Sequence, residues 1–162
     1  MKNLISNSLE ETEKIAFEWL NDIAHQYSEM DEALFVGLSG HLGAGKTAFV
    51  KAVAKKLGIV EDVTSPTFVI MKSYKINHKI VEENNSDLVL KQTIPWQYLV
   101  HIDAYRLEKR QELEAIQWEK IVADKNNLII MEWPENVELS EFAPLADLRF
   151  QILDDKHSIS IS

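Results

Sequence analysis

The stretch LSGHLGAGKTAFV, residues 38–50, holds three of the five glycines in this chain of 162 residues. Within it, residues 40–47 satisfy the pattern G-x-x-x-x-G-K-[ST], in which small residues let successive backbone N–H groups turn inward around phosphates. The lysine of this pattern, Lys46, reaches the β- and γ-phosphates of a nucleotide, and the hydroxyl of Thr47 binds Mg²⁺. The stretch therefore predicts a phosphate-binding loop at the start of a helix.

The flanking segments supply the context that this motif requires. The run ALFVGLSG before the loop is continuously apolar and ends in glycine, which is typical of a strand buried on both faces. Behind the loop, Gly58 stands where the C-cap glycine of a helix belongs. The apolar stripe that leads to it has helical spacing and consists of Val50, Val53, Ala54 and Leu57. A structural glycine turn without a ligand is the alternative, but the order of strand, loop and helix favours a nucleotide site.

The rest of the pattern predicts an α/β fold. Residues 8–26 are typical of an amphipathic helix with Ser8 as its N-cap, and residues 110–122 of a second helical segment. Short, apolar, β-rich runs lie at residues 67–74, 98–105 and 127–133. Apolar and polar residues alternate on both sides of residues 154–156, which predicts a closing hairpin.

We therefore expect a single domain over residues 1–162, with a P-loop NTPase-like, mixed and mostly parallel sheet, flanking helices and a C-terminal β-hairpin. Within residues 75–98 the chain turns polar, and KIVEENNSDLVL reads as two short strands around the turn at Asn84 and Asn85. This segment is predicted to be a hairpin inserted at the surface.

Charge and composition exclude several classes of function. The 26 acidic and 17 basic residues give a formal net charge of −9, which argues against direct binding of DNA or RNA. No apolar run reaches the length of a membrane span, and residues 1–8 lack the basic start and apolar core of a signal peptide. We therefore expect a cytoplasmic protein. The absence of cysteine excludes disulfides and thiolate metal sites and fits a reducing compartment.

Two acidic residues are candidates for a magnesium site. Asp103 ends the run YLVHID and Glu132 ends NLIIME, and the carboxyl ends of parallel strands open onto the ligand crevice. Either acid alone could be a solvated strand end, but we expect at least one to contact the metal directly or through water. His101 lies two residues before Asp103, on the same strand face, and is expected to pack or to orient that acid.

The nucleotide is predicted to be ATP, because the chain lacks the Asn/Thr-Lys-x-Asp element that recognises guanine in GTPases. Kinases of small molecules usually clamp a second anionic substrate with several arginines, whereas this chain has only Arg106, Arg110 and Arg149. Hydrolysis of ATP, or ATP binding as a switch, is therefore favoured. A P-loop small-molecule kinase and a non-hydrolysing, nucleotide-gated adaptor remain the alternatives.

Four segments together resemble one known family. GHLGAGKTAF, TSPTFVIMKSY, HIDAYRL and MEWPENV, in this order, are similar to the TsaE family of small P-loop ATPases in bacterial tRNA threonylcarbamoyladenosine synthesis. The resemblance implies weak ATP binding by the chain alone and partnership with TsaD and TsaB, which carry out the transfer to tRNA. It implies that this chain meets tRNA only indirectly and that its nucleotide cycle supports turnover of the complex.

The resemblance also implies roles for individual residues. Asp103 corresponds to a Walker B-like acid, and Glu132 to a second acid near the metal that is important for hydrolysis. Lys46, Asp103 and Glu132 are thus the expected catalytic residues, and Thr47, Asp103 and Glu132 the expected metal ligands. The residues expected to bind the nucleotide are Gly40, His41, Leu42, Gly43, Ala44, Gly45, Lys46, Thr47, Ala48, Thr67 and Trp133.

Two of the implied roles have simpler alternatives. Residues 65–67 correspond to a switch-like segment near the γ-phosphate but could be turn residues ahead of a strand. Trp133 corresponds to a functional aromatic residue but could be part of the core.

The chain also departs from the family in places. His41 stands where the family most often has an acidic residue, and Ala48 replaces a frequent second threonine. The segment between Tyr74 and Tyr98 is longer than is usual in the family. At His41, any contact that the family's acid makes to a partner or to the attacking water is in doubt. At Ala48, one hydroxyl near the α-phosphate should be missing.

Overall fold

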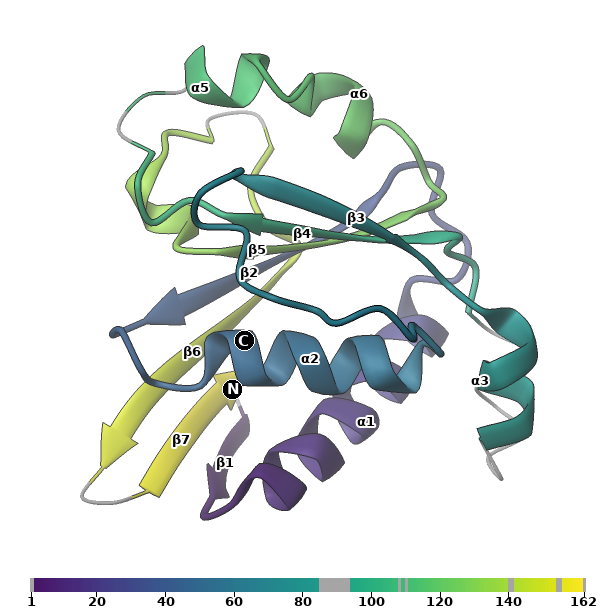
Figure 1. Ribbon diagram of the computed structural model, residues 1–162, viewed down its shortest axis with the longest axis vertical. Helices are drawn as coiled ribbons and strands as arrows, with labels where there is room; N and C mark the ends of the chain where they lie inside the picture. Colours follow the sequence, from purple (N-terminus) through teal and green to yellow (C-terminus); the bar gives the residue numbers. More distant parts are fainter. Residues whose placement is uncertain are drawn as a thin grey trace.

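The central feature of the fold is one mixed β-sheet, seen in a computed structural model that describes residues 2–84, 94–107, 109, 111–139, 142–153 and 156–161. Its seven strands lie in the order β1-β7-β6-β2-β5-β4-β3 (Figure 1). The strands are β1 (Lys2–Ser6), β2 (Leu34–Gly40), β3 (Met71–Lys75), β4 (Tyr98–Asp103), β5 (Asn127–Glu132), β6 (Ala146–Leu153) and β7 (Lys156–Ile161).

The centre of this sheet is parallel and its edges are antiparallel. β2 pairs in parallel with β5 and β6, and β5 pairs in parallel with β4. The antiparallel pairs are β3 with β4, β6 with β7, and β7 with β1. The predicted mixed α/β sheet and its closing C-terminal hairpin, β6–β7, are confirmed. The parallel arrangement brings the carboxyl ends of β2, β4 and β5 to one edge.

Helices cover both faces of the sheet (Figure 1). α1 (Leu9–Gln26) and α2 (Lys46–Lys56) cover one face, and the short helices α5 (Gln111–Glu114) and α6 (Trp118–Val122) cover the other. Ser8 caps α1 as predicted, because its side chain accepts a hydrogen bond from the Glu11 N–H at 3.2 Å. Among the described residues, none of the helices combines the length and the apolar character that crossing a bilayer requires.

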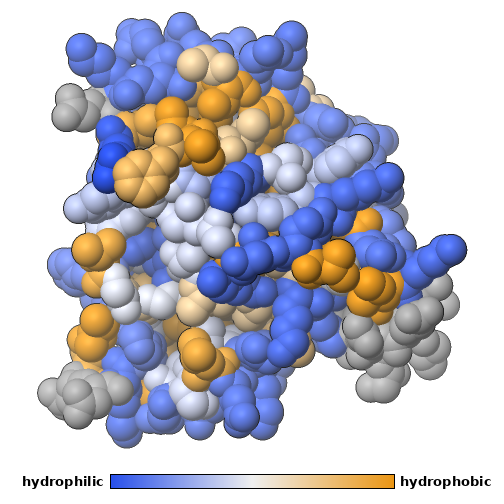
Figure 2. All heavy atoms as spheres, in the orientation of Figure 1, coloured by the Kyte–Doolittle hydropathy of each residue, from blue (hydrophilic) through white to orange (hydrophobic). Residues whose placement is uncertain are grey.

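Each helical layer closes its own hydrophobic core. Under α1 and α2, the Phe49 ring packs edge-on against Trp19 at 5.2 Å and against Phe150 at 5.6 Å. Under α6, Trp118 packs against Phe35 at 5.0 Å between ring centroids. Figure 2 shows apolar side chains gathered where α5 and α6 cover the sheet. The rigid sheet between these cores is what holds the strand ends in place.

The predicted hairpin at residues 75–98 is wrong in its first half, which is the helix α3 (His78–Asn84). The Asn77 side chain accepts a hydrogen bond from the Ile80 N–H at 3.3 Å, as a helix N-cap does, and Val81 is buried. The residues from Asn77 onward therefore have the local pattern of a capped helix. The second half of the predicted hairpin, residues 85–93, lies outside the described residues.

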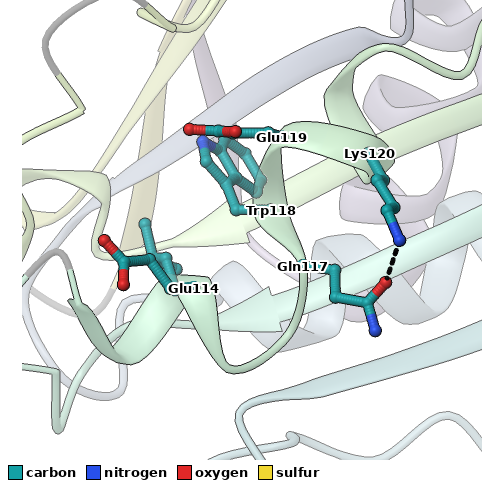
Figure 3. A pocket seen from close by; sticks show the side chains of 6 residues that line it. Glu114, Gln117, Trp118, Glu119 and Lys120 are labelled. Atoms are coloured by element: carbon teal, nitrogen blue, oxygen red, sulfur yellow. Dashed lines mark hydrogen bonds between the residues drawn. The ribbon is translucent and has the colours of Figure 1, made fainter.

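Two other predicted elements are shorter than expected. β3 begins only at Met71, because the chain turns before it: the Val69 N–H bonds the Pro66 carbonyl at 2.9 Å, and Ile70 adopts a left-handed φ of 66°. The helix predicted at residues 110–122 is broken at Gln117, whose φ is 57°. Figure 3 shows this break, where the Lys120 ammonium group contacts the Gln117 side chain.

The loop between β2 and α2 needs glycine at defined positions. Gly40 has φ 131°, and a Cβ atom there would lie 2.1 Å from the Phe150 carbonyl oxygen on β6. Gly43 has φ 79°, but a Cβ atom there would meet nothing within 4 Å. The backbone therefore lies directly against β6 at Gly40, the last residue of β2, whereas the loop stands free at Gly43.

We expect Gly40→Ala to destabilise the protein more than Gly43→Ala. Both variants place a side chain at positive φ, which costs about 1–2 kcal/mol, but only Gly40→Ala adds a backbone clash of about 1–3 kcal/mol. Urea unfolding of the two variants and the wild type measures the difference. Equal free energies of unfolding for the two variants would show that β6 shifts to make room for the added methyl group without loss of stability.

Candidate active site

The loop after β2 opens into a pocket of about 430 Å³ at the carboxyl edge of the sheet. Side chains from the start of α2, from the segment before β3 and from the ends of β4 and β5 converge there. The lining residues are Leu42, Gly43, Gly45, Lys46, Thr47, Ala48, Ser65, Thr67, Asp103, Tyr105, Glu132 and Trp133. The pocket thus brings together the three predicted catalytic residues and most of the predicted nucleotide-binding residues. Gly40, His41 and Ala44 line neighbouring pockets instead.

Lys46 is held by the loop that precedes it. Its side chain is buried, and Nζ donates to the carbonyl oxygens of Gly40 at 2.7 Å and His41 at 3.0 Å. Nζ also lies 3.9 Å from the centroid of the Trp133 ring. Burial lowers the pKa of Lys46, and the charges of nearby carboxylates, Glu132 first among them, partly oppose this effect. A phosphate entering the pocket would compete with two carbonyl groups for this ammonium.

Glu132 receives hydrogen bonds from two side chains. The Thr47 hydroxyl donates to its carboxylate, with distances of 2.8 Å to Oε1 and 3.1 Å to Oε2. His101 Nε2 lies 2.9 Å from Oε1, and both side chains are buried. His101 was expected to pack or to orient Asp103, but it contacts Glu132. In the β4–β5 register His101 lies opposite Ile130, so Glu132 is its diagonal neighbour on the same sheet face.

Asp103 ties the segment before β3 to the sheet. Its Oδ2 accepts hydrogen bonds from the hydroxyls of Ser65 at 2.7 Å and Thr67 at 2.5 Å, and its Oδ1 accepts one from the Tyr105 N–H at 3.0 Å. Asp103 and Glu132 lie opposite each other in the parallel register of β4 and β5. The two predicted acids therefore stand side by side, each held by its own donors.

The donor set of this pocket fits magnesium better than a transition metal. Within the part of the chain that the structure describes, no cluster of three or more His, Cys, Asp or Glu side chains could hold a metal ion. What the pocket offers is the hydroxyl of Thr47 and the carboxylates of Asp103 and Glu132. Mg²⁺ is commonly bound by one or two carboxylates together with substrate phosphates and water.

Trp133 belongs to the wall of the pocket. It follows β5 directly, adopts a left-handed φ of 60°, and its N–H donates to the Leu38 carbonyl at 3.0 Å. Its ring packs against Tyr105 at 5.2 Å between centroids and faces Lys46. The alternative of pure core packing therefore does not describe this side chain.

Comparison with known proteins identifies the family of this chain. The family described as "Threonylcarbamoyl adenosine biosynthesis protein TsaE" matches residues 6–160. The chain belongs to the TsaE family. The resemblance stated from the sequence is thereby confirmed, and with it membership of a family of tRNA threonylcarbamoyladenosine biosynthesis proteins.

Three similar TsaE relatives differ in how much of the chain they match. A protein of Treponema pallidum is 32% identical over 135 residues, covering 82% of this chain and 84% of the relative. One of Borreliella burgdorferi is 35% identical over 99 residues, covering 60% of this chain and 58% of the relative. One of Bacillus subtilis is 43% identical over 75 residues, covering 46% and 36%. All three are called "tRNA threonylcarbamoyladenosine biosynthesis protein TsaE".

A solved structure, "Crystal structure of Bacillus subtilus YdiB", matches the TsaE fold seen here with a TM-score of 0.60. The match covers 99% of this chain and 83% of the other, at 24% sequence identity. It supports the α/β architecture of this chain.

A second pocket of this TsaE-family chain was not predicted from the sequence. It has a volume of about 260 Å³, lies beside the loop and shares Gly45 and Ala48 with the first pocket. Its other lining residues are Asn7, Ser8, Leu9, Thr12, Ala44, Phe150, His157 and Ile159. The ring of His157 contacts the Ala44 carbonyl through Nδ1 at 3.1 Å. No local pattern could have linked Asn7 to His157, because the β1–β7 pairing brings the two ends of the chain together.

We expect Asp103→Ala to loosen the segment before β3. The variant removes the acceptor for the Ser65 and Thr67 hydroxyls, and hydrogen bonds to charged groups are worth about 1.5–3 kcal/mol each. Amide hydrogen exchange of residues 64–71 should therefore become at least about tenfold faster. Asp124→Ala, in the exposed turn before β5, is the control and should leave this segment unchanged. Unchanged amide hydrogen exchange in Asp103→Ala would show that the Asp103 carboxylate does not hold this segment in place.

We expect Lys46→Met to retain or increase the stability of the nucleotide-free protein at pH 7. Because the pKa of Lys46 is lowered by burial, the unfolded chain binds its proton more tightly than the folded chain does. The cost of the buried charge is thus present at neutral pH and fades as pH rises towards about 10.4, the pKa of an unperturbed lysine.

Urea unfolding at pH 7 and pH 9.5 tests this, with Lys51→Met on the exposed face of α2 as the control. The advantage of Lys46→Met over the wild type should shrink at the higher pH. A variant that is less stable than the wild type by more than about 1 kcal/mol would mean that the two carbonyl contacts outweigh the cost of burial.

Proposed function

We propose that this chain is a Mg²⁺-dependent ATPase whose nucleotide cycle supports the TsaD–TsaB transferase complex in tRNA N6-threonylcarbamoyladenosine synthesis. The observation that carries the proposal is the convergence of Lys46, Thr47, Asp103 and Glu132 in one pocket. Membership of the TsaE family supports the pathway. The role in hydrolysis, the metal and the two partners are the proposed part.

The start of α2 suits a polyphosphate. α2 begins at Lys46, and its N-cap is Gly45, which offers no side-chain hydrogen bond to the first N–H groups of the helix. Those N–H groups and the positive end of the helix dipole favour an anion at this point. Lys46 would exchange its carbonyl partners for the β- and γ-phosphates.

Mg²⁺, when bound, would neutralise charge on the phosphates and orient them. Thr47, Asp103 and Glu132 are the residues that would hold it. Asp103 is fixed by the hydroxyls of Ser65 and Thr67, so that segment is coupled to the occupant of the pocket. Glu132 retains an oxygen, Oε2, whose hydrogen bond from Thr47 is the longer one, and we assign this oxygen to orienting the attacking water.

The second pocket, of about 260 Å³, is the proposed site of the adenosine part of ATP. It adjoins the phosphate pocket through Gly45 and Ala48, so one ligand could occupy both. Its polar groups from Asn7, Thr12 and His157 and its apolar wall from Phe150 and Ile159 suit a heteroaromatic base and a ribose. Ala48 adds no hydroxyl between the two pockets.

The acidic surface favours protein partners over direct contact with tRNA. A net charge of −9 repels a polyanion, so TsaD and TsaB would hold the tRNA while this chain supplies the ATP cycle. A cytoplasmic location follows from this proposed role, because tRNA modification takes place there.

The first test is phosphate release from Mg²⁺-ATP by the purified chain, alone and with TsaD and TsaB of the same organism. We expect slow release alone and strong stimulation in the complex. Lys46→Ala should abolish ATP binding. Glu132→Gln should keep binding but lower kcat by about 100-fold or more, as expected when a residue that orients the nucleophile is lost.

Other outcomes would point to the alternative functions. ADP formation that depends on an added metabolite, and not on partner proteins, would indicate a small-molecule kinase. ATP-dependent binding to the partners without phosphate release would indicate an adaptor. Loss of binding in both Lys46→Ala and Glu132→Gln would contradict the separate roles given to these residues.

A further inference from the structure

His101 is a fully buried polar side chain in the middle of the sheet. It lies on β4 between Leu99 and Asp103 on the sheet face that α2 covers, opposite Ile130 of β5. Its one hydrogen bond in the described part of the chain joins Nε2 to Oε1 of Glu132 at 2.9 Å. Its other ring nitrogen, Nδ1, is buried without a hydrogen-bond partner among the described residues. A buried polar side chain with one partner is retained at a cost, which points to a role for that contact.

The contact has a defined direction. The Thr47 hydroxyl donates to the Glu132 carboxylate, and a carboxylate only accepts, so the His101 ring donates its Nε2–H. The other ring nitrogen, Nδ1, has no partner among the described residues. The neutral tautomer with its hydrogen on Nδ1 would bury an N–H group without an acceptor and remove the donor from Glu132, which makes it unfavourable here.

The two donors to Glu132 differ in how firmly they are tied to the pocket. Thr47 carries the hydroxyl that would bind the proposed Mg²⁺. Its hydrogen bond to Glu132 is therefore expected to change when the nucleotide binds. His101 is buried and is not among the residues that line the pocket. A ligand in this pocket would therefore meet Thr47 and Glu132 directly, but not the His101 ring.

We propose that His101 is a positioning residue that holds Oε1 of Glu132 through the nucleotide cycle and thereby keeps Oε2 aimed at the attacking water. This inference rests on the proposed function, since it concerns the same acid. The Glu132 carboxylate is then held in position from β4, the neighbouring strand, while the Thr47 hydroxyl can change its partner.

Kinetics with ATP separate positioning from packing. His101→Leu keeps the bulk of the side chain but removes the donor, and should lower kcat about 10- to 100-fold while KM for ATP changes less than about threefold. His101→Gln carries an amide N–H that can reach Oε1 and should recover at least about half of the lost kcat on a logarithmic scale. His25→Gln, in the exposed last turn of α1, is the matched control and should leave both constants unchanged.

Two kinetic results would overturn the proposal. An unchanged kcat in His101→Leu would show that Glu132 needs no support from β4. Equal losses in His101→Leu and His101→Gln would assign the effect to packing. Thermal unfolding of both variants identifies any loss that is due to misfolding, and His101→Gln then decides the question if only His101→Leu fails to fold.

A spectroscopic measurement tests the contact even if the wild type hydrolyses no ATP. In ¹⁵N-histidine-labelled protein, the His101 ring should show the Nε2–H tautomer with a slowly exchanging proton, assigned by comparison with His101→Gln. The signal should shift in Glu132→Gln and persist when Mg²⁺ and a non-hydrolysable ATP analogue are added. Loss of the signal on nucleotide binding would overturn the proposal even if ATP is hydrolysed. Absence of phosphate release in the wild type with its partners would overturn the proposed function, and with it the role of Oε2, while a persistent signal would still show that His101 holds Oε1.

Discussion

The site depends on one constraint, the burial of three charges at a single edge of the sheet. Lys46, Asp103 and Glu132 are 4%, 5% and 3% exposed. Buried charges are costly unless they are satisfied, and the usual solution is to pair them. Within the described residues no ion pair joins Lys46 to either acid. Each is satisfied separately, by backbone carbonyls, by hydroxyls or by an imidazole. The charges are therefore kept apart and available to a ligand that carries charge of both signs.

The two cores turn this arrangement into fixed geometry. β4 and β5 contribute side chains to both cores, so the strands that carry Asp103 and Glu132 have little freedom to slide. The register then sets which side chains meet. A shift of one residue between β4 and β5 would turn Glu132 to the other face, away from Thr47.

The parts of the site that are encoded locally could be predicted from the sequence. Lys46 and Thr47 follow from the spacing of glycines, and Asp103 and Glu132 from their places at the ends of apolar runs. The contact of His101 with Glu132 could not be predicted, because it depends on the register of two strands separated by an irregular connection. The predicted hairpin failed for the opposite reason. Its first half contains Asn77, whose side chain caps a helix, and this local signal is stronger than the turn signal of Asn84 and Asn85.

The second pocket depends on the pairing of strands that are far apart in the sequence. The second pocket takes residues from both ends of the chain, because β1 pairs with β7 and places Ser6 opposite His157. During synthesis, the P-loop and its helix can form long before β7 has emerged from the ribosome. A growing chain could thus hold a phosphate group before it could enclose a whole nucleotide. Pairing of β7 with β1 would complete the second pocket, so nucleotide affinity would report that this pairing has formed.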